Sequence, residues 1–249
     1  MTEPILEVTR LCKSFGALQA TRNVSFTVQP GHIHALIGPN GAGKTTLVNQ
    51  LTGDILPDSG AVFYRSRDIT HLKVHRRARL GIARSFQITH IFENLTVAEN
   101  MALSICAHQG HNFRFWQKSS QSRVVQERLP EALATVDVDR RADMPAGSLS
   151  HGEKRQLEVG MALTGNPDLL ILDEPMAGLG PGGTVELSKL IRKLKGSLTM
   201  LLVEHDMDVV FSLADRITVL DYGENILTGS PEAVRRNERV RDAYLGDSD

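Results

Sequence analysis

The chain has 249 residues, of which 41% are hydrophobic and 23% charged, and its formal net charge is -1. This composition is ordinary for a folded globular protein and excludes wholesale disorder. The near-neutral balance excludes an overall electrostatic attraction for nucleic acid or for an anionic membrane.

Two further features concern the compartment. No apolar stretch approaches the ~20 residues that a membrane-spanning helix needs, and Met1–Pro4 lacks the basic-then-apolar pattern of a secretion signal. Cys12 and Cys106 form no CxxC pattern, so we expect reduced thiols in packed positions and neither a disulfide nor a zinc site. Together these features predict a chain that is in the cytoplasm or faces it.

The N-terminal part is expected to form strands. Ile5–Thr9 alternates weakly, and Asn23–Val28 carries β-branched residues at alternate places. His32–Ile37 is mostly apolar and leads into a glycine-rich loop. Gly43–Leu51 then has a helical pattern, and Gly53 is its expected stop.

The character of the chain changes between about residues 71 and 160, where strand signals fade and polar helical patterns dominate. Val124–Val136 is an example of these helices, and the polar stretch His108–Ser122 is expected to be a loop or irregular connection. From Asp168 onwards short apolar strands alternate with amphipathic helices, which indicates a parallel α/β sheet. The segments are Leu169–Leu172, Gly183–Leu194, Thr199–Val203, Asp206–Ala214 and Ile217–Leu220. A hairpin partner at Asn225–Gly229 and one charged helix from about Pro231 to Tyr244 complete the chain.

The glycine-rich loop has the pattern GxxxxGK[ST] between a strand and a helix, which is specific for phosphate binding in that context. Its glycines let backbone N–H groups approach phosphate oxygens, and the following helix directs the positive end of its dipole there. Lys44 is expected to reach the β- and γ-phosphates, and Thr45 to bind Mg²⁺ through its hydroxyl. The expected ATP-binding residues of the loop are Gly38, Pro39, Asn40, Gly41, Ala42, Gly43, Lys44, Thr45 and Thr46.

Two carboxylates follow the apolar strand Leu169–Leu172. A buried strand delivers them at its carboxyl end, where ligands bind in open α/β sheets. Asp173 is placed to bind Mg²⁺, and Glu174 is the candidate to polarise the attacking water. His205 follows another apolar strand and could donate a hydrogen bond to a γ-phosphate, or else be a helix cap or a surface residue. Gln87 is a weak signal by itself.

A family resemblance joins these motifs. Leu149-Ser150-His151-Gly152-Glu153 resembles the signature motif of ABC-type ATPases, and the phosphate loop, Gln87, the signature, the acidic strand and His205 follow one another in that family's order. The resemblance implies one ABC ATPase domain over 1–249, of the α/β class with a P-loop NTPase core. It further implies an N-terminal antiparallel β subdomain, a RecA-like core at about 1–87 and 161–249, and an inserted helical signature subdomain at about 88–160.

The resemblance also implies residue roles. Phe15 matches the aromatic that stacks on adenine, although a core phenylalanine is the alternative. Gln87 matches the glutamine that senses the γ-phosphate and Mg²⁺ and lies against the transmembrane partner. Glu174 matches the catalytic glutamate and His205 the switch histidine. The residues that match the signature, which contacts ATP held by the other subunit, are Ser150, His151, Gly152 and Glu153.

Three positions depart from the family pattern. His151 stands where many members have glycine, and Glu153 where many have glutamine. Both are tolerable, because Ser150 and Gly152, which meet phosphate, are kept. Gly180 stands where an aspartate or asparagine often links the two ATP sites, which puts the coupling between those sites in doubt.

The subfamily resemblance is to the ATPase subunits of importers of branched-chain amino acids, urea and amides, with ATPases of lipopolysaccharide export as the alternative. It is carried by Gly81–Gln87, Phe92–Asn100, Val203–Met207 and Ala243–Gly246. It implies a homodimer or heterodimer that sandwiches ATP, separate permease subunits, an extracytoplasmic substrate-binding protein, and a peripheral location on the cytoplasmic face of the inner membrane.

Other classes fit less well. No Asn-Lys-x-Asp sequence is present to read guanine, which excludes a GTPase. A nucleic-acid or other non-transport ABC ATPase finds support only in one basic run, which we interpret as a solvated or partner-facing surface. An inactive cassette is disfavoured because the phosphate-loop lysine, both acids and the histidine are in place. The basic run comprises Lys73, His75, Arg76, Arg77, Arg79 and Arg84.

Overall fold

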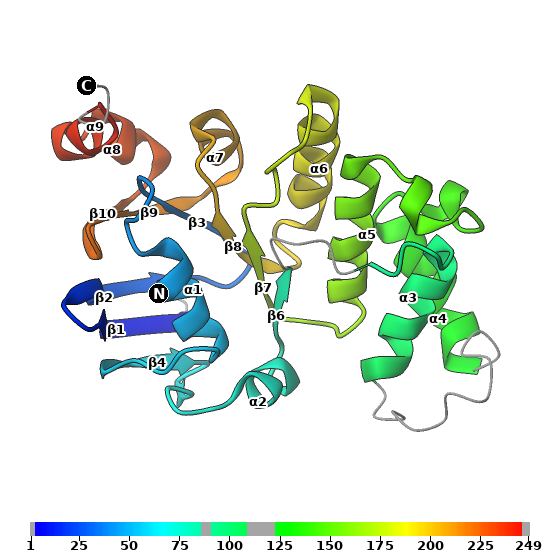
Figure 1. The fold of residues 1–249 in the computed structure, drawn as a ribbon, viewed down its shortest axis with the longest axis horizontal. Helices are drawn as coiled ribbons and strands as arrows, with labels where there is room; N and C mark the ends of the chain where they lie inside the picture. Colours follow the sequence, from blue (N-terminus) through cyan, green and yellow to red (C-terminus); the bar gives the residue numbers. More distant parts are fainter. Residues whose placement is uncertain (1–2, 86–90, 109–122, 246–249) are drawn as a thin grey trace. The chain divides into compact units, whose positions relative to one another are not determined.

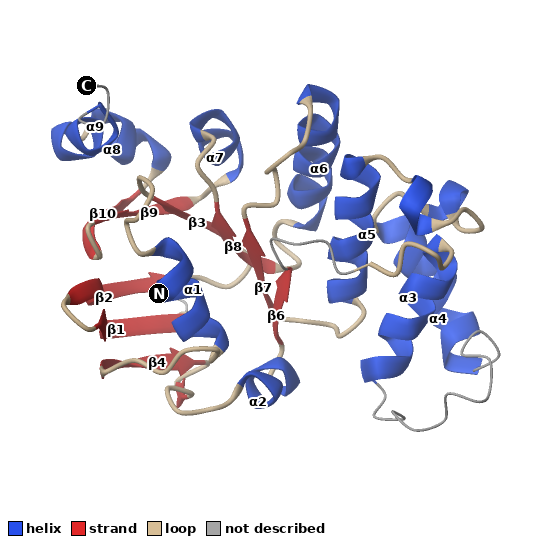
Figure 2. Cartoon of the chain, in the orientation of Figure 1, coloured by secondary structure: helices blue, strands red, loops and turns tan. Residues whose placement is uncertain are grey.

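The computed structural model describes residues 3–85, 91–108 and 123–245 (Figures 1 and 2). The chain divides into two compact units. The first comprises Met1–Ile82, Asp168–Glu174 and Leu194–Asp249, and the second Ala83–Pro167 and Pro175–Lys193. No described helix has both the length and the apolar character that a bilayer crossing requires.

The first unit begins with an antiparallel sheet in the order β2-β1-β4-β5. β1 (Leu6–Phe15) pairs with β2 (Leu18–Val28) on one side and with β4 (Ser59–Tyr64) on the other; β5 (Arg67–Asp68) extends the edge. Buried and exposed residues alternate along much of β1 and β2, because one face of such a sheet packs on the core. The expected antiparallel sheet is therefore present.

A six-stranded sheet follows in the order β10-β9-β3-β8-β7-β6. The strands β3, β8, β7 and β9 run parallel, and β10 is antiparallel to β9. Every residue of β3, β7 and β8 is buried, which explains their unbroken apolar runs. The bounds are β3 Ile33–Ile37, β6 Ile82–Ser85, β7 Leu169–Asp173, β8 Thr199–Val203, β9 Arg216–Asp221 and β10 Glu224–Gly229.

The predicted parallel sheet is confirmed, but β6 was missed. It lies in the segment where strand signals fade, because four residues are too few to establish a period.

Two glycines delimit the first helix of this unit. α1 (Lys44–Thr52) begins after Gly43 and ends at Gly53, which adopts a φ of 86° that favours glycine, as predicted. Apolar side chains of α1 pack between the two sheets. The cluster includes Val24, Phe26, Leu36, Leu47, Leu51, Val62, Leu169 and Leu201. This packing fixes the helix that follows the glycine-rich loop.

The prediction of a single helix from about Pro231 to Tyr244 is wrong. α7 (Met207–Leu213) precedes β9, and after β10 the described residues form two helices, α8 (Pro231–Arg236) and α9 (Glu238–Leu245). Asn237 separates the last two in an extended conformation, and its side-chain oxygen accepts the backbone N–H of Val240. Asparagine thus ends one helix and caps the next, since its side chain competes for backbone hydrogen bonds.

Arg77, in α2 (Val74–Arg79), is buried, which corrects the interpretation of the whole basic run as a solvated or partner-facing surface. Its guanidinium donates hydrogen bonds of 2.6–2.9 Å to four backbone carbonyl oxygens, those of Gln50, Leu51, Thr70 and Leu72. Two of these belong to the last turn of α1, whose carbonyls have no partner within the helix. Burial lowers the pKa of Arg77 to about 10, against the opposing effect of Asp54 and Asp68.

We expect Arg77→Met to lower the free energy of unfolding by roughly 3–5 kcal/mol, because it leaves buried carbonyl groups without donors. Urea unfolding followed by circular dichroism measures this. Arg76→Met is the matched control, since Arg76 is exposed on the same helix, and its effect should stay within about 0.5 kcal/mol. Equal unfolding midpoints for the two variants would contradict the structural role of Arg77.

A second buried polar group is His34 in β3. Its Nε2 lies 2.7 Å from the Thr218 hydroxyl, and its ring packs on Phe26. Burial, with smaller contributions from Arg216 and His32, lowers the pKa of His34 to about 3. The folded chain therefore holds this imidazole neutral at neutral pH.

His34 should make the fold sensitive to acid. The His34 imidazole takes up a proton near pH 6.5 in the unfolded chain but only near pH 3 in the folded chain. Protonation therefore favours the unfolded chain between these values, so the free energy of unfolding is highest above pH 6.5 and falls as the pH falls toward 3. At pH 4 the loss amounts to about 3 kcal/mol. His34→Gln keeps a partner for Thr218 and should flatten the dependence of unfolding free energy on pH between 7 and 4. Parallel pH profiles for the two proteins would refute this.

The second unit consists mainly of helices, which are α3 (Val97–His108), α4 (Arg123–Thr135), α5 (His151–Leu163) and α6 (Pro181–Leu194). A Cβ at Gly160 of α5 would lie 2.6 Å from the Cε atom of Met101, so glycine permits α5 to approach α3 closely. Helices in this region agree with the sequence analysis. Residues 109–122, in the stretch expected to be irregular, lie outside the described residues.

Candidate active site

The glycine-rich loop joins β3 to α1, and its glycines are required by their surroundings. A Cβ at Gly38 would lie 2.3 Å from the carbonyl oxygen of Leu220, and one at Gly43 would lie 2.1 Å from that of Ala20. Gly41 has a φ of 80° and nothing near its missing side chain. The loop is thus packed against β9 and β2 on one side and open at its crest, as a phosphate cradle requires.

Lys44 is the first residue of α1, and its side chain is buried under the loop. Its ammonium group donates to the carbonyl oxygens of Gly38, at 2.7 Å, and Pro39, at 3.0 Å. Burial lowers the pKa of Lys44, while the carboxylates of Glu174 and Asp173 oppose the shift. The cation is therefore held against the loop that is to receive phosphate.

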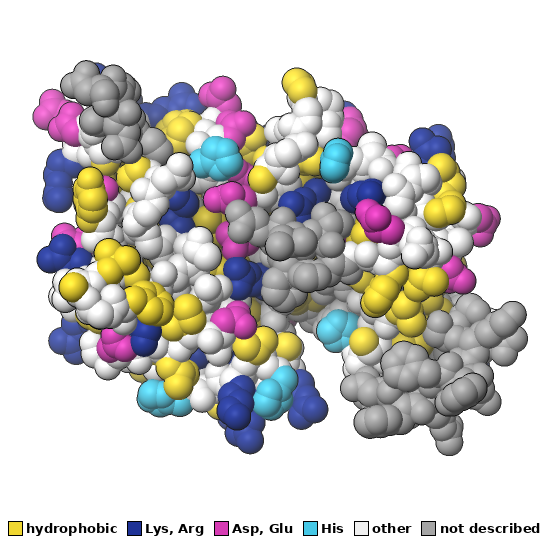
Figure 3. Space-filling view, viewed as in Figure 1, with side chains coloured by type: hydrophobic (Ala, Val, Ile, Leu, Met, Phe, Trp, Pro, Cys, Tyr) yellow, Lys and Arg dark blue, Asp and Glu magenta, His cyan; other side chains and the backbone are white. Residues whose placement is uncertain are grey.

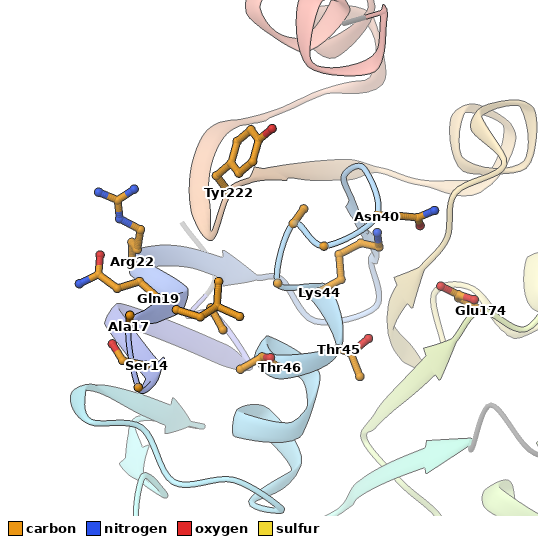
Figure 4. A pocket seen from close by; sticks show the side chains of 16 residues that line it. Ser14, Ala17, Gln19, Arg22, Asn40, Lys44, Thr45, Thr46, Glu174 and Tyr222 are labelled. Carbon is orange, nitrogen blue, oxygen red and sulfur yellow. The ribbon is translucent and has the colours of Figure 1, made fainter. Parts of the chain in front are cut away.

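A cavity of about 710 Å³ opens beside this loop (Figure 4). One end holds the start of α1 and Glu174, and the other is formed by the β1–β2 hairpin and the β9–β10 turn. Its volume is in the range of small-molecule sites. The loop contributes Asn40, Gly41, Ala42, Gly43, Lys44, Thr45 and Thr46; the other lining residues are Ser14, Gly16, Ala17, Leu18, Gln19, Ala20, Arg22, Glu174 and Tyr222.

The two acids end β7 as predicted. Asp173 is 3% exposed, and Glu174 follows it with a φ of 48°, a left-handed conformation that is unfavourable for a glutamate. A hydrogen bond of 2.9 Å from the Glu174 N–H to the carbonyl oxygen of Val203 in β8 maintains this conformation. In Figure 4 the Glu174 side chain lies on the side of the cavity where Lys44 and Thr45 lie. This backbone conformation places the Glu174 carboxylate at the end of the cavity that holds the start of α1.

His205 follows β8, and its side chain is 61% exposed. Its backbone N–H donates to the buried carboxylate of Glu204, and its Nδ1 lies 3.8 Å from the same oxygen. His205 does not line the cavity. The structure therefore places the imidazole at the strand end, as expected, without bringing it into the cavity.

Phe15 is 49% exposed at the end of β1, so the alternative of a core phenylalanine is wrong. The ammonium group of Lys13 lies 5.7 Å from its ring centroid. Its neighbours Ser14 and Gly16 line the cavity, whereas Phe15 does not. With the exposed Leu18 it contributes to the hydrophobic side chains that gather over the β1–β2 hairpin (Figure 3).

The signature residues lie in the second unit, at the start of α5. The Ser150 hydroxyl accepts the N–H of Glu153, whose carboxylate in turn accepts the N–H and the hydroxyl of Ser150, which forms a capping box. Glu153 also pairs with Arg141 at 3.0 Å. Burial opposes the ionisation of Glu153, but the hydrogen bonds from Ser150 and the pair with Arg141 hold its pKa below the usual value.

This capping box explains a departure from the family pattern, because Glu153 completes it as glutamine would. The sequence signal for the box is a serine followed by a glutamate three residues later. Gly152 also has a packing role, since a Cβ there would lie 3.2 Å from the Cα of Gly183 in α6. His151 is exposed, a Cβ at Gly180 would meet open space, and Gln87 lies outside the described residues.

Comparisons with known proteins agree with this geometry. The family model for the ABC transporter matches residues 21–177, and the model for the branched-chain amino acid ATP-binding cassette transporter matches residues 224–249. The chain is 38% identical to the high-affinity branched-chain amino acid transport ATP-binding proteins BraF of Pseudomonas aeruginosa and LivG of Escherichia coli, over 100% of each chain. It is 33% identical to the lipopolysaccharide export system ATP-binding protein LptB of Acidithiobacillus ferridurans, over 98% of this chain and 97% of that one.

A solved structure shares the fold. It is an ATP-binding cassette of an ABC transporter in its ADP conformation, with a TM-score of 0.84 and 31% identity over 99% of this chain and 100% of that one. These matches confirm the predicted fold class and the predicted nucleotide binding. The chain therefore belongs to the ABC transporter family as an ATP-hydrolysing subunit.

Proposed function

We propose that this chain drives the import of branched-chain amino acids, or of related urea and amide solutes, through a separate permease. The observation that carries the proposal is the match of residues 224–249, which contain β10, α8 and α9, to the branched-chain amino acid cassette model. The full-length likeness to BraF and LivG supports it.

The alternative is the ATPase of an exporter, and the likeness to LptB favours it. LptB matches almost the whole chain, so the ATPase machinery itself does not separate import from export. The C-terminal match and the higher identity to BraF and LivG support the importer.

At the phosphate end of the cavity, Lys44 and the loop N–H groups bind the β- and γ-phosphates of ATP. The hydroxyl of Thr45 and the carboxylate of Asp173 are oxygen donors of the kind that Mg²⁺ prefers, and we assign them, with Gln87, to that ion. Bound Mg²⁺ would neutralise phosphate charge. These residues together align the γ-phosphate for attack.

Glu174 accepts the proton of the attacking water, which we infer from its position at the phosphate end and its strained backbone. His205, which follows β8, donates a hydrogen bond to the γ-phosphate. Phe15, whose neighbours Ser14 and Gly16 line the cavity, stacks on the adenine. The roles of Glu174 and His205 rest on their positions at the ends of β7 and β8.

A second cassette, identical or similar, completes the site. Its Ser150 and Gly152, with His151 and Glu153 beside them, meet the γ-phosphate at the start of α5, where the helix dipole favours an anion. ATP stabilises the closed dimer only by its higher affinity for that state, so hydrolysis reopens it. In this scheme the core at about 1–87 and 161–249 holds the nucleotide, and the helical subdomain at about 88–160 holds the signature.

The assembly lies on the cytoplasmic face of the inner membrane, where the cassettes bind permease subunits and an extracytoplasmic protein delivers the solute. The test is to co-express the tagged chain with the genes adjacent to its own, to isolate the membrane subunits that co-purify with it, and to reconstitute the complex in vesicles. ATP-dependent leucine uptake that a Glu174→Gln complex lacks supports import. Recovery of no membrane subunit would overturn the transport proposal, and lipopolysaccharide release without uptake would establish the exporter.

A further inference from the structure

The turn between β9 and β10 carries an aromatic residue in an unfavourable conformation. Asp221 pairs with Glu224, so the hairpin loop is the two residues Tyr222 and Gly223. Their φ values are 42° and 79°, the geometry of a type I′ turn. Asn-Gly and Asp-Gly are the favoured sequences for this turn, since a bulky side chain is strained at positive φ. A tyrosine here indicates that its side chain serves a purpose other than the turn.

The turn is fastened to the phosphate loop. The Gly223 N–H donates to the Ala42 carbonyl oxygen at 3.0 Å, and the Arg22 N–H donates to the Gly223 carbonyl oxygen at 2.7 Å. A Cβ at Gly223 would lie 2.9 Å from the carbonyl oxygen of Ala20. Gly223 is therefore required by the packing, and the position of Tyr222 is fixed relative to the cavity.

Tyr222 is 79% exposed and lines the cavity. Figure 4 shows it on the same side as Ala17 and Gln19 of the β1–β2 hairpin, away from Thr45 and Glu174. Because the phosphates occupy the end with Thr45 and Glu174, the sugar and base of a nucleotide extend toward the end with Tyr222.

We propose that the ring of Tyr222 packs against the adenosine half of ATP, and that the turn is strained in order to present it. Aromatic rings stack on nucleobases and cover the sugar with little loss of side-chain entropy. The inference rests on ATP binding in this cavity and adds a determinant of nucleoside affinity on β9–β10, separate from the β1–β2 hairpin that carries Phe15.

The test is calorimetric titration of the full chain with ATP, ADP and inorganic tripolyphosphate. Tyr222→Ala should weaken ATP and ADP binding roughly tenfold, as expected for the loss of one base–aromatic contact, and leave tripolyphosphate binding unchanged. Tyr222→Phe keeps the ring and should keep parental affinities. Tyr222→Gly relieves the strain, so it should match the thermal stability of the parent or exceed it while losing the same affinity as Tyr222→Ala.

Each other outcome overturns the proposal. Unchanged ATP affinity in Tyr222→Ala and Tyr222→Gly would make Tyr222 a turn residue only. A parallel loss for tripolyphosphate would place the effect in the phosphate loop, and an equal loss in Tyr222→Phe would assign it to the hydroxyl. A parent chain that binds tripolyphosphate and ATP equally would exclude any adenosine contact, whereas a parent that binds neither would refute the nucleotide site itself.

Discussion

A Glu174→Gln chain is expected to bind ATP with parental affinity and to hydrolyse it at least about a hundredfold more slowly, the usual effect of losing a general base. The substitution removes the proton acceptor and keeps the size and hydrogen-bonding reach of the side chain. Because hydrolysis reopens the pair of cassettes in the proposed cycle, the variant should accumulate as an ATP-bound dimer. Phosphate release and size-exclusion chromatography with ATP measure the two effects.

Glu186→Gln is the matched control for that experiment. Glu186 is an exposed residue of α6 that pairs with Lys189, so its replacement should leave turnover at the parental level. Hydrolysis at the parental rate in Glu174→Gln would show that the base is another group. Slow hydrolysis combined with lost ATP binding would instead indicate a damaged cavity.

The second large effect is expected for Lys44→Ala, which should weaken ATP binding by roughly ten- to a hundredfold, the loss that follows removal of a charged hydrogen bond. The alanine also gives up the two hydrogen bonds that tie the start of α1 to the carbonyl oxygens of Gly38 and Pro39. Both losses act on the phosphate cradle. Calorimetry with ATP and with ADP measures the affinities.

Lys189→Ala removes an exposed lysine and should leave ATP affinity unchanged. A thermal unfolding curve of Lys44→Ala establishes that the chain is still folded before the affinities are compared. Parental ATP affinity in a folded Lys44→Ala chain would contradict the phosphate-loop assignment.

Sequence reasoning located the strands and motifs because their signals are local. The strand Thr199–Val203 was predicted at its observed bounds, since a buried parallel strand is a continuous apolar run. Gly53 was identified as the end of α1 because glycine alone tolerates that conformation at no cost. The phosphate loop was also predictable from local sequence, because its glycines, lysine and threonine stand at fixed spacings.

The burial of Arg77 and the conformation of Glu174 could not be predicted, because their deciding contacts lie far away in the sequence. Arg77 and Arg76 are adjacent and chemically identical, and only the position of α1 determines that one is buried. The strained conformation of Glu174 is held by the hydrogen bond that its N–H donates to the Val203 carbonyl oxygen of β8, which no local pattern contains. The Ser150–Glu153 box was different, because its serine–glutamate spacing is visible in the sequence. The β9–β10 hairpin was predicted, whereas the exposure of Tyr222 in its turn was not.

The burial of Arg77 has a practical consequence for mapping the partners of this subunit. In a charge-reversal scan, each basic residue is replaced by an acidic one and the loss of binding to the partner subunit is measured. The segment 73–84 is an obvious choice for such a scan, because it holds the basic run. Arg77 would give the strongest signal in it, although its guanidinium contacts only this chain's own backbone in the hydrogen bonds described above. A pull-down alone would therefore report a false interface at Arg77, and a melting curve for each variant would separate misfolded subunits from those that lack a docking contact.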